Sequence, residues 1–173
     1  MAACPISVRP MQASHIGYVT DLLTDGEIKA ALRCRDLTRR KWARAFRKNL
    51  QDPDERNFIF YKEDVPVGWL CLNGMEGDMA WISMLVVHPA HRRQGAGAFA
   101  VRWGEEFVKS LGFHTMGLRT TGDNFPAQAC YEKLGYILVK EGEYLYYDGV
   151  RRTGLTIENQ LTILKMQERA SYD

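Results

Sequence analysis

One stretch near the middle of the chain has the residue types and spacing needed to hold an anion. It runs from Val87 to Gly97 with the sequence VHPAHRRQGAG, which is an apolar run, a short turn and the start of a helix. The first amides of a helix have no partner within the helix, and the helix dipole adds positive potential there. Gly95 and Gly97 would let a phosphate approach those amides, and Arg92 and Arg93 add charge nearby.

Two common nucleotide-binding patterns are excluded for this stretch. No Lys-Ser or Lys-Thr pair follows the glycines, as a Walker loop requires, and Ala100 stands where the dinucleotide fingerprint has its third glycine. A Gly-x-Gly pattern also fits a plain helix start whose glycines serve close packing. The stretch therefore predicts either a phosphate-bearing ligand of another kind or a helix start without a ligand.

Hydrophobic periodicity predicts the elements that would position this turn. Trp42, Phe46 and Leu50 recur every fourth residue as one apolar helix stripe, and residues 81–87 are bulky and apolar on both faces, as in a central strand. The expected elements are a strand at 6–11, a helix at 14–25, a helical region at 27–50, strands at 57–61, 65–72 and 81–87, a helix at 95–111, a strand at 115–121, a helix at 127–134, and a final hairpin at 136–140 and 144–147. This alternation, β-α-α-β-β-β-α-β-α-β-β, predicts a mixed sheet flanked by helices.

Length and composition are those of one globular domain. The chain has 173 residues, 46% hydrophobic and 25% charged, which excludes a disordered tail, a collagen-like repeat and a disulfide mini-protein. The net charge is +2, so overall affinity for polyanions is not indicated. No uncharged stretch reaches the length of a membrane span, and no secretory leader is visible, so we expect a cytoplasmic protein. Its four scattered cysteines indicate reduced thiols and no metal site: Cys4, Cys34, Cys71 and Cys130.

Two motifs together resemble a known family. The pattern V-x-P-x-x-R-x-x-G-x-G from Val87 to Gly97 is similar to the acyl-CoA loop of the GNAT superfamily of N-acyltransferases. One helix and one strand later, Asn124, Ala127, Tyr131 and the residues up to Tyr136 resemble that family's following motif. The resemblance covers residues 79–136 well, the first half weakly and the tail not at all. It implies an α/β (α+β) fold with a GNAT-like, mixed and mostly antiparallel sheet. We expect one domain at 1–149 and, from the apolar residues of the tail, an extension at 150–173 that docks or exchanges with a partner.

The resemblance also implies roles for individual residues, with acetyl-CoA as co-substrate. Backbone groups of Leu85 and Val87 would pair with the pantetheine arm, and an N–H near Val86 would polarise the thioester carbonyl. Asn124 would bind the pantetheine region, and Tyr131 would protonate the departing thiolate as general acid. The full implied binding set is Leu85, Val86, Val87, Arg92, Arg93, Gln94, Gly95, Ala96, Gly97, Ala98, Asn124, Ala127 and Tyr131.

The general base is where the sequence departs from the family. An amine with a pKa near 10 is mostly protonated at neutral pH, so a group must accept its proton. Many relatives place a glutamate at the start of the fourth strand, and Trp81 stands there. Glu76 and Asp78, just before that strand, are the base candidates. The alternatives are residues of the expected hairpin: Glu141, Glu143, Tyr144 and Tyr146.

The leading hypothesis is an N-acetyltransferase that moves an acetyl group from acetyl-CoA to a primary amine by direct attack in a ternary complex. The expected partners are a small-molecule or peptide amine and, as one possible assembly, a homodimer, without a membrane. A degenerate acyl-CoA-binding sensor is the alternative, because the strand glutamate is missing. A nucleic-acid module is the less favoured alternative: residues 33–48 carry eight basic residues and one acidic, a local charge of +7. The same run also fits a solvated helix face or a surface that attracts an anionic acceptor.

Overall fold

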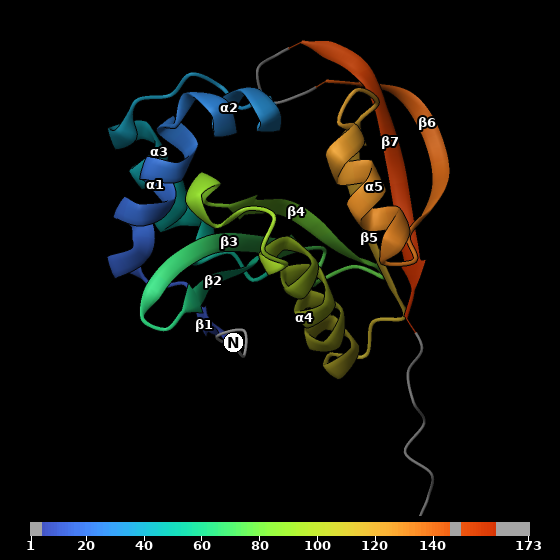
Figure 1. Ribbon diagram of the computed structural model, residues 1–173, viewed down its shortest axis with the longest axis horizontal. Helices are drawn as coiled ribbons and strands as arrows, with labels where there is room; N and C mark the ends of the chain where they lie inside the picture. The colour runs from blue at the N-terminus through green and yellow to red at the C-terminus, as the bar shows by residue number, and fades with distance from the viewer. Residues whose placement is uncertain (1–4, 146–149, 162–173) are drawn as a thin grey trace, which may run out of the picture.

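The computed structural model describes residues 5–145 and 150–161 (Figure 1). The elements are β1 (Ile6–Pro10), α1 (Ile16–Thr24), α2 (Gly26–Leu32), α3 (Arg39–Asn49), β2 (Arg56–Lys62), β3 (Val65–Asn73), β4 (Ala80–Val87), α4 (Ala96–Ser110), β5 (Thr115–Thr121), α5 (Phe125–Lys133), β6 (Ile137–Leu145) and β7 (Arg151–Gln160). Short 3-10 turns precede α1 and follow β4. Within the described residues, none of the helices has the length and apolar character that a membrane span requires.

The strands form a single seven-stranded sheet in the order β1-β2-β3-β4-β5-β7-β6. Every neighbouring pair is antiparallel except β4 and β5, which are parallel. Side chains of α4 and α5 join the core cluster on one face of the sheet, and those of α1, α2 and α3 join the cluster on the other. The structure thus confirms the mixed, mostly antiparallel sheet with flanking helices and places β4 at its centre.

The helical region predicted at 27–50 is two helices, which is a correction. Helix α2 ends at Arg33, whose φ of 53° lies in the left-handed region, and the chain is irregular until α3 begins. Thr38 starts α3 as its N-cap, because its hydroxyl accepts a hydrogen bond from the Lys41 amide at 3.4 Å. The apolar stripe of Trp42 and Phe46 belongs to α3 alone and faces the sheet at Trp69.

The predicted final hairpin is also wrong. Residues 137–145 form one continuous strand, β6, whose partner β7 comes from the expected extension at 150–173. Strand β7 lies between β5 and β6, and Leu161 after it is buried in the core. The sequence pattern indicated a turn at Glu141, Gly142 and Glu143, because glycine and glutamate are depleted in strands. Tyr146 and residues 162–173 lie outside the described residues.

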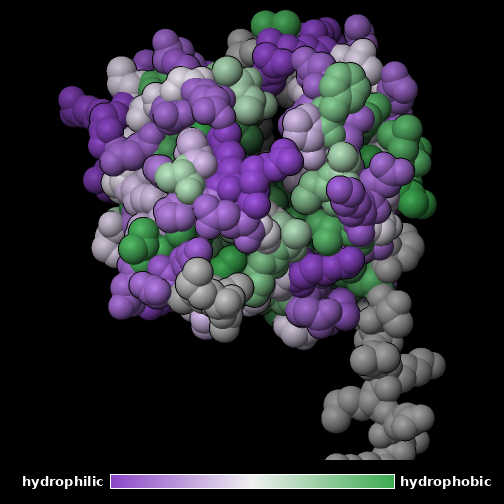
Figure 2. Space-filling model, viewed as in Figure 1, coloured by the Kyte–Doolittle hydropathy of each residue, from purple (hydrophilic) through white to green (hydrophobic). Residues whose placement is uncertain are grey.

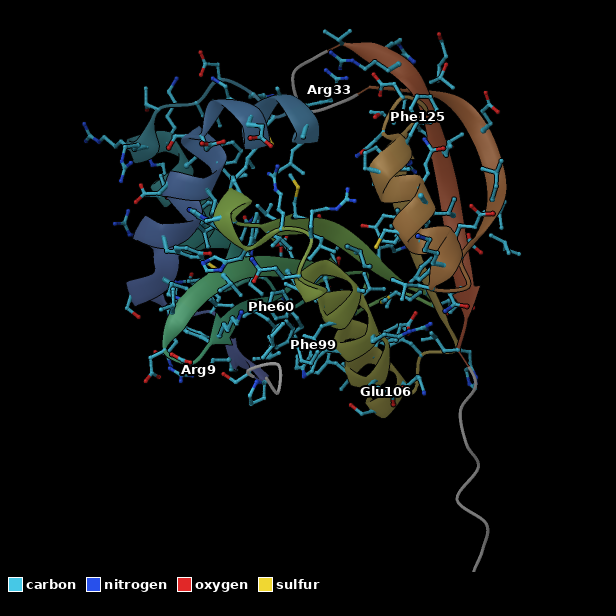
Figure 3. The ribbon with its side chains drawn as sticks, in the orientation of Figure 1. Arg9, Arg33, Phe60, Phe99, Glu106 and Phe125 are labelled. Carbon is cyan, nitrogen blue, oxygen red and sulfur yellow. The ribbon has the colours of Figure 1, made fainter. Side chains whose placement is uncertain are left out.

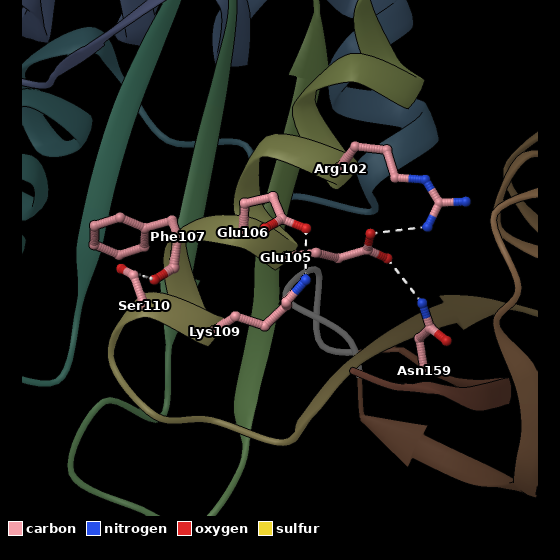
Figure 4. Close-up of polar contacts among 7 residues, drawn as sticks. All are labelled: Arg102, Glu105, Glu106, Phe107, Lys109, Ser110 and Asn159. Atoms are coloured by element: carbon pink, nitrogen blue, oxygen red, sulfur yellow. Dashed lines mark hydrogen bonds and ion pairs between the residues drawn. The ribbon is translucent and has the colours of Figure 1, made fainter. Parts of the chain in front are cut away.

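A buried carboxylate ties α4 to β7 (Figure 4). Glu105 is 4% exposed and accepts hydrogen bonds from Arg102, at 2.9 Å, and from the Asn159 side chain of β7, also at 2.9 Å. The next residue, Glu106, instead pairs with Lys109 at the surface and is 71% exposed. A buried carboxylate with two donors holds β7 in place far more firmly than an exposed ion pair does.

We therefore expect Glu105→Ala to lower the free energy of unfolding by about 2 kcal/mol, because it leaves the partly buried amide of Asn159 without its acceptor. The control Glu106→Ala removes an exposed ion pair and should change stability by less than about 0.5 kcal/mol. Urea unfolding of both variants measures the difference. Equal effects would contradict the anchoring role of Glu105.

Candidate functional site

The cleft of this protein begins where β4 and β5 separate. Only three register pairs join them, Ala80 with Met116, Trp81 with Gly117 and Ile82 with Leu118. Against β3, Ile82 lies opposite Leu72 and Met84 opposite Cys71, so Ser83 is an extra residue on β4. A bulge of this kind bends its strand and increases its twist. The structure therefore opens the sheet at Ser83, and among the described residues no strand pairs with the rest of β4 on that side.

The open edge of β4 presents backbone hydrogen-bonding groups. The His88 amide donates to the Val67 carbonyl of β3 at 2.9 Å. Because successive residues of a strand alternate their backbone groups between the two sides, Leu85 and Val87 direct theirs to the open edge. Such an edge can accept an extended polar chain as if it were another strand. One group is already engaged, since the Val87 carbonyl accepts a hydrogen bond from Arg92 Nε at 3.2 Å.

A cleft of about 140 Å³ occupies this opening, and the molecular surface is hollowed between the α1–α3 part and the α5 part (Figure 2). Four segments contribute its walls: the end of α2, the middle of β4, the end of β5 and the first turns of α5. Its lining residues are Ala31, Leu32, Arg33, Ile82, Ser83, Met84, Leu85, Leu118, Arg119, Thr120, Thr121, Asn124, Ala127 and Tyr131. The structure thus brings together four residues of the predicted set, Leu85, Asn124, Ala127 and Tyr131.

The start of α4 lies against the end of β4. Gly95 is the N-cap with a φ of 85°, and Arg93 before it also has a positive φ, of 61°. The Phe99 amide is the first that bonds back into the helix, to the Gly95 carbonyl at 2.9 Å, so the amides of Ala96, Gly97 and Ala98 lack intrahelical acceptors. A Cβ on Gly97 would lie 3.8 Å from a methyl of Val87, and one on Gly95 would meet nothing within 4 Å.

Two side chains of the predicted binding set are held by the protein itself. Arg92 forms an ion pair with Glu27 of α2 in addition to its bond to Val87. Gln94 accepts from Lys62 Nζ at 3.3 Å and donates to the Ala90 carbonyl at 3.4 Å. Arg92, which the sequence predicted to bind the ligand, therefore holds the turn after β4 against α2.

Tyr131 lies at the inner wall of the cleft. It is 9% exposed, its ring lies 5.6 Å from that of Tyr136, and burial raises the pKa of its phenol well above 10, with a smaller contribution from Cys130. The phenol is thus protonated throughout the neutral range. Asn124 has a structural role that sequence reasoning missed: its side-chain oxygen caps α5 by accepting from the Ala127 amide at 3.4 Å.

The structure does not bring the predicted base candidates to the cleft. Glu76 and Asp78 precede β4 at its paired end, and the Glu76 amide is bonded to Asp54 at 3.0 Å. Neither residue lines the cleft, and at about 3.3 Å per residue the first residue of β4, Ala80, already lies roughly 13 Å from Met84. Glu141 and Glu143 lie on the edge strand β6.

Two cleft-lining arginines and one carboxylate of β7 were not assigned a role in the site from the sequence. Arg33 and Arg119 line the cleft, although only Arg33 stood out, as part of the basic run. Glu158 of β7 is the register partner of Gly117, which is itself the partner of Trp81. Register partners share a face of the sheet. On that face a row of partners runs from Trp81, at the position where the family has its glutamate, through Gly117, which has no side chain, to Glu158. The strand β7 was not predicted, so no sequence signal could have placed Glu158 there.

Comparisons with known proteins agree with this geometry. Residues 17–136 match the model of the acetyltransferase (GNAT) family. A spermidine N-acetyltransferase from Vibrio cholerae, solved with CoA and spermine, superimposes with a TM-score of 0.80 at 14% identity, over 90% of this chain and 95% of that one. The ribosomal-protein-S18-alanine N-acetyltransferase from Escherichia coli superimposes with a TM-score of 0.71 at 16% identity, over 94% and 98%. No curated protein sequence matches the chain.

These structural neighbours are too distant in sequence to show more than the fold, but the family model covers well over half of the chain. With the parted central strands and the two motifs on their walls, the chain belongs to the GNAT family of acetyltransferases, enzymes that transfer an acetyl group from acetyl-CoA to amines.

Proposed function

We propose that this acetyltransferase holds acetyl-CoA along the open edge of β4 and passes the acetyl group directly to an amine bound in the same cleft. The observation that carries the proposal is the separation of β4 from β5 after Ile82. It leaves the Leu85 and Val87 amides free to pair with the amide-bearing pantetheine arm. The amides of Ala96, Gly97 and Ala98 at the start of α4 would then receive the diphosphate.

Tyr131 is the proposed proton donor to the departing sulfur. Its phenol lines the cleft, and its raised pKa keeps the proton on the oxygen at working pH. Because the pKa of the phenol is raised, full transfer of its proton to a thiolate is energetically unfavourable, since the parent thiol has a pKa near 8.5. Tyr131 therefore acts mainly as a hydrogen-bond donor that stabilises negative charge on sulfur as the C–S bond breaks.

The proton of the attacking amine needs a different route. Glu76 and Asp78 remain predicted bases, and they would have to accept the proton across the distance that separates them from the cleft. Glu158 is the carboxylate whose register partner, Gly117, pairs with Trp81, and it is half-buried on β7. We infer that an ordered water chain leads from the amine toward Glu158, which replaces the glutamate that relatives carry on the fourth strand.

Tyr131→Phe tests the proton donor, since it keeps the ring and removes only the hydroxyl. We expect kcat to fall about 100-fold, the lower range for loss of one donor that stabilises transition-state charge, with the CoA dissociation constant nearly unchanged. Tyr136→Phe is the matched control, because Tyr136 is also buried but does not line the cleft. Steady-state kinetics and calorimetry measure both. An unchanged kcat in Tyr131→Phe removes this residue from the chemistry.

Gly97→Leu tests the diphosphate site. A leucine favours the helix more than glycine does, so α4 should remain intact, while its side chain crowds the first amides. We expect CoA binding at least tenfold weaker, about 1.4 kcal/mol. Gly17→Leu, in α1 with nothing within 4 Å of its Cβ position, is the control. Normal CoA affinity in Gly97→Leu would count against this placement of the diphosphate.

A thiol-release assay with acetyl-CoA across a diverse amine library tests the activity itself. Release that depends on an amine supports transfer. CoA binding without transfer to any amine would instead support the sensor, and a salt-sensitive DNA complex through residues 33–48 would support the nucleic-acid module. A homodimer remains a prediction. The edge strand β6 has apolar residues with large exposed fractions that a second copy would cover: Ile137 at 62%, Leu138 at 56% and Val139 at 47%.

A further inference from the structure

The outer part of the cleft is lined by positive charge. Arg33 at the end of α2 and Arg119 on β5 are its two charged lining residues, and among the described residues that line it none is acidic. The two arginines come from opposite walls, since α2 and β5 lie on either side of the opening. The acceptor amine must enter a space flanked by two guanidinium groups.

Arg33 is held in an unusual way. Its backbone has a φ of 53°, a conformation that residues with a side chain rarely adopt, and it ends α2 where a glycine would be usual. Its Nη2 donates to Asp123 before α5 at 2.8 Å, so the side chain spans from α2 toward α5 (Figure 3). Its Nε is buried without a hydrogen-bond partner in the described part of the chain. Part of the hydrogen-bonding capacity of this guanidinium is therefore unused within the described part of the chain.

Arg119 is fixed by stacking. Its guanidinium carbon lies 4.0 Å from the centre of the Tyr144 ring, and the Tyr144 hydroxyl is bonded to Thr156 Oγ1 at 3.2 Å. Stacking occupies the flat face of a guanidinium and leaves its edge N–H groups for a planar oxyanion. Arg119 forms no ion pair with any residue that the structure describes.

From these two arginines we infer that the acceptor is an amine that also carries an oxyanion, a carboxylate or a phosphate, which Arg33 and Arg119 bind while the amine faces the thioester. This inference rests on the proposed function and names its substrate class. Asp123 neutralises part of the charge of Arg33, but it is 61% exposed at the rim, and one positive charge remains in excess. A polyamine would meet like charge here, although the structural neighbour from Vibrio cholerae is a spermidine acetyltransferase.

The basic residues at 33–48 extend the same field beyond the cleft. Their local charge of +7 is partly offset by the ion pairs of Arg39 with Asp21 and of Arg33 with Asp123. A surface of this sign raises the encounter rate of anionic substrates and slows that of cations. The basic residues after Arg33 thus favour the same acceptor without contacting it.

Matched amine pairs test the inference. Lysine against cadaverine differs by one carboxylate, and O-phosphoethanolamine against ethanolamine differs by one phosphate, so the two pairs also distinguish the two oxyanions. We expect kcat/KM at least tenfold higher for the oxyanion-bearing member of one or both pairs, and lower discrimination at high salt. Equal or better use of cadaverine and ethanolamine would overturn the inference and leave the acetyltransferase activity standing. No transfer to any amine would overturn both.

Arg33→Ala and Arg119→Glu should each remove at least tenfold of this preference, with the KM for acetyl-CoA changed less than threefold. Arg119 is exposed, so its variant retains the fold even if Arg33→Ala unfolds, which thermal unfolding reports. Arg9→Ala is the matched control, because Arg9 also stacks on a tyrosine, Tyr61 at 4.3 Å, and pairs with an aspartate, but far from the cleft. If the variants instead weaken acetyl-CoA binding and leave the preference intact, the arginines serve the donor and the inference is wrong.

Discussion

The separation of β4 from β5 is the constraint on which the rest of this structure depends. Continuous pairing would satisfy the backbone of β4 within the protein and leave no edge for a ligand. The extra residue Ser83 and the shortness of the parallel ladder, three register pairs, prevent that. An unsatisfied strand edge in a protein interior is costly, so the opening persists because other parts of the fold hold its two walls apart.

Both walls are anchored away from the opening. On one side, α1–α3 pack against β2–β4 through a core that includes Phe46 and Trp69. On the other, β7 joins β5 to β6 and is tied to α4 by the buried Glu105. Between them, Arg92 links the turn after β4 to α2 through Glu27, and Arg33 links α2 to the loop before α5 through Asp123. Of these two ion pairs, the one between Arg33 and Asp123 crosses the opening from α2 to the loop before α5.

The sequence predicted the parts that depend on local patterns. The strand at 115–121 matches β5, and the glycines at 95 and 112 bound α4 as expected, because capping and hydrophobic periodicity are local signals. The predictions from the sequence failed where pairing between distant segments determines the structure. A charged, glycine-containing segment becomes β6 only because β7 pairs with it, and Arg33 breaks the helical region at 27–50 in a conformation that its residue type does not signal. Arg119 likewise lines the cleft, and Glu158 likewise comes into register with Gly117, only through strand pairing.

The most direct measurement of the central claim is amide hydrogen exchange, residue by residue, with and without CoA. Binding along β4 and at the start of α4 predicts slower exchange at Leu85 and Val87 and at Gly97 and Ala98, with little change in β1 and β2. Protection confined to other segments, or none at saturating CoA, would contradict the account, because the parted strands would then not be where the cofactor binds.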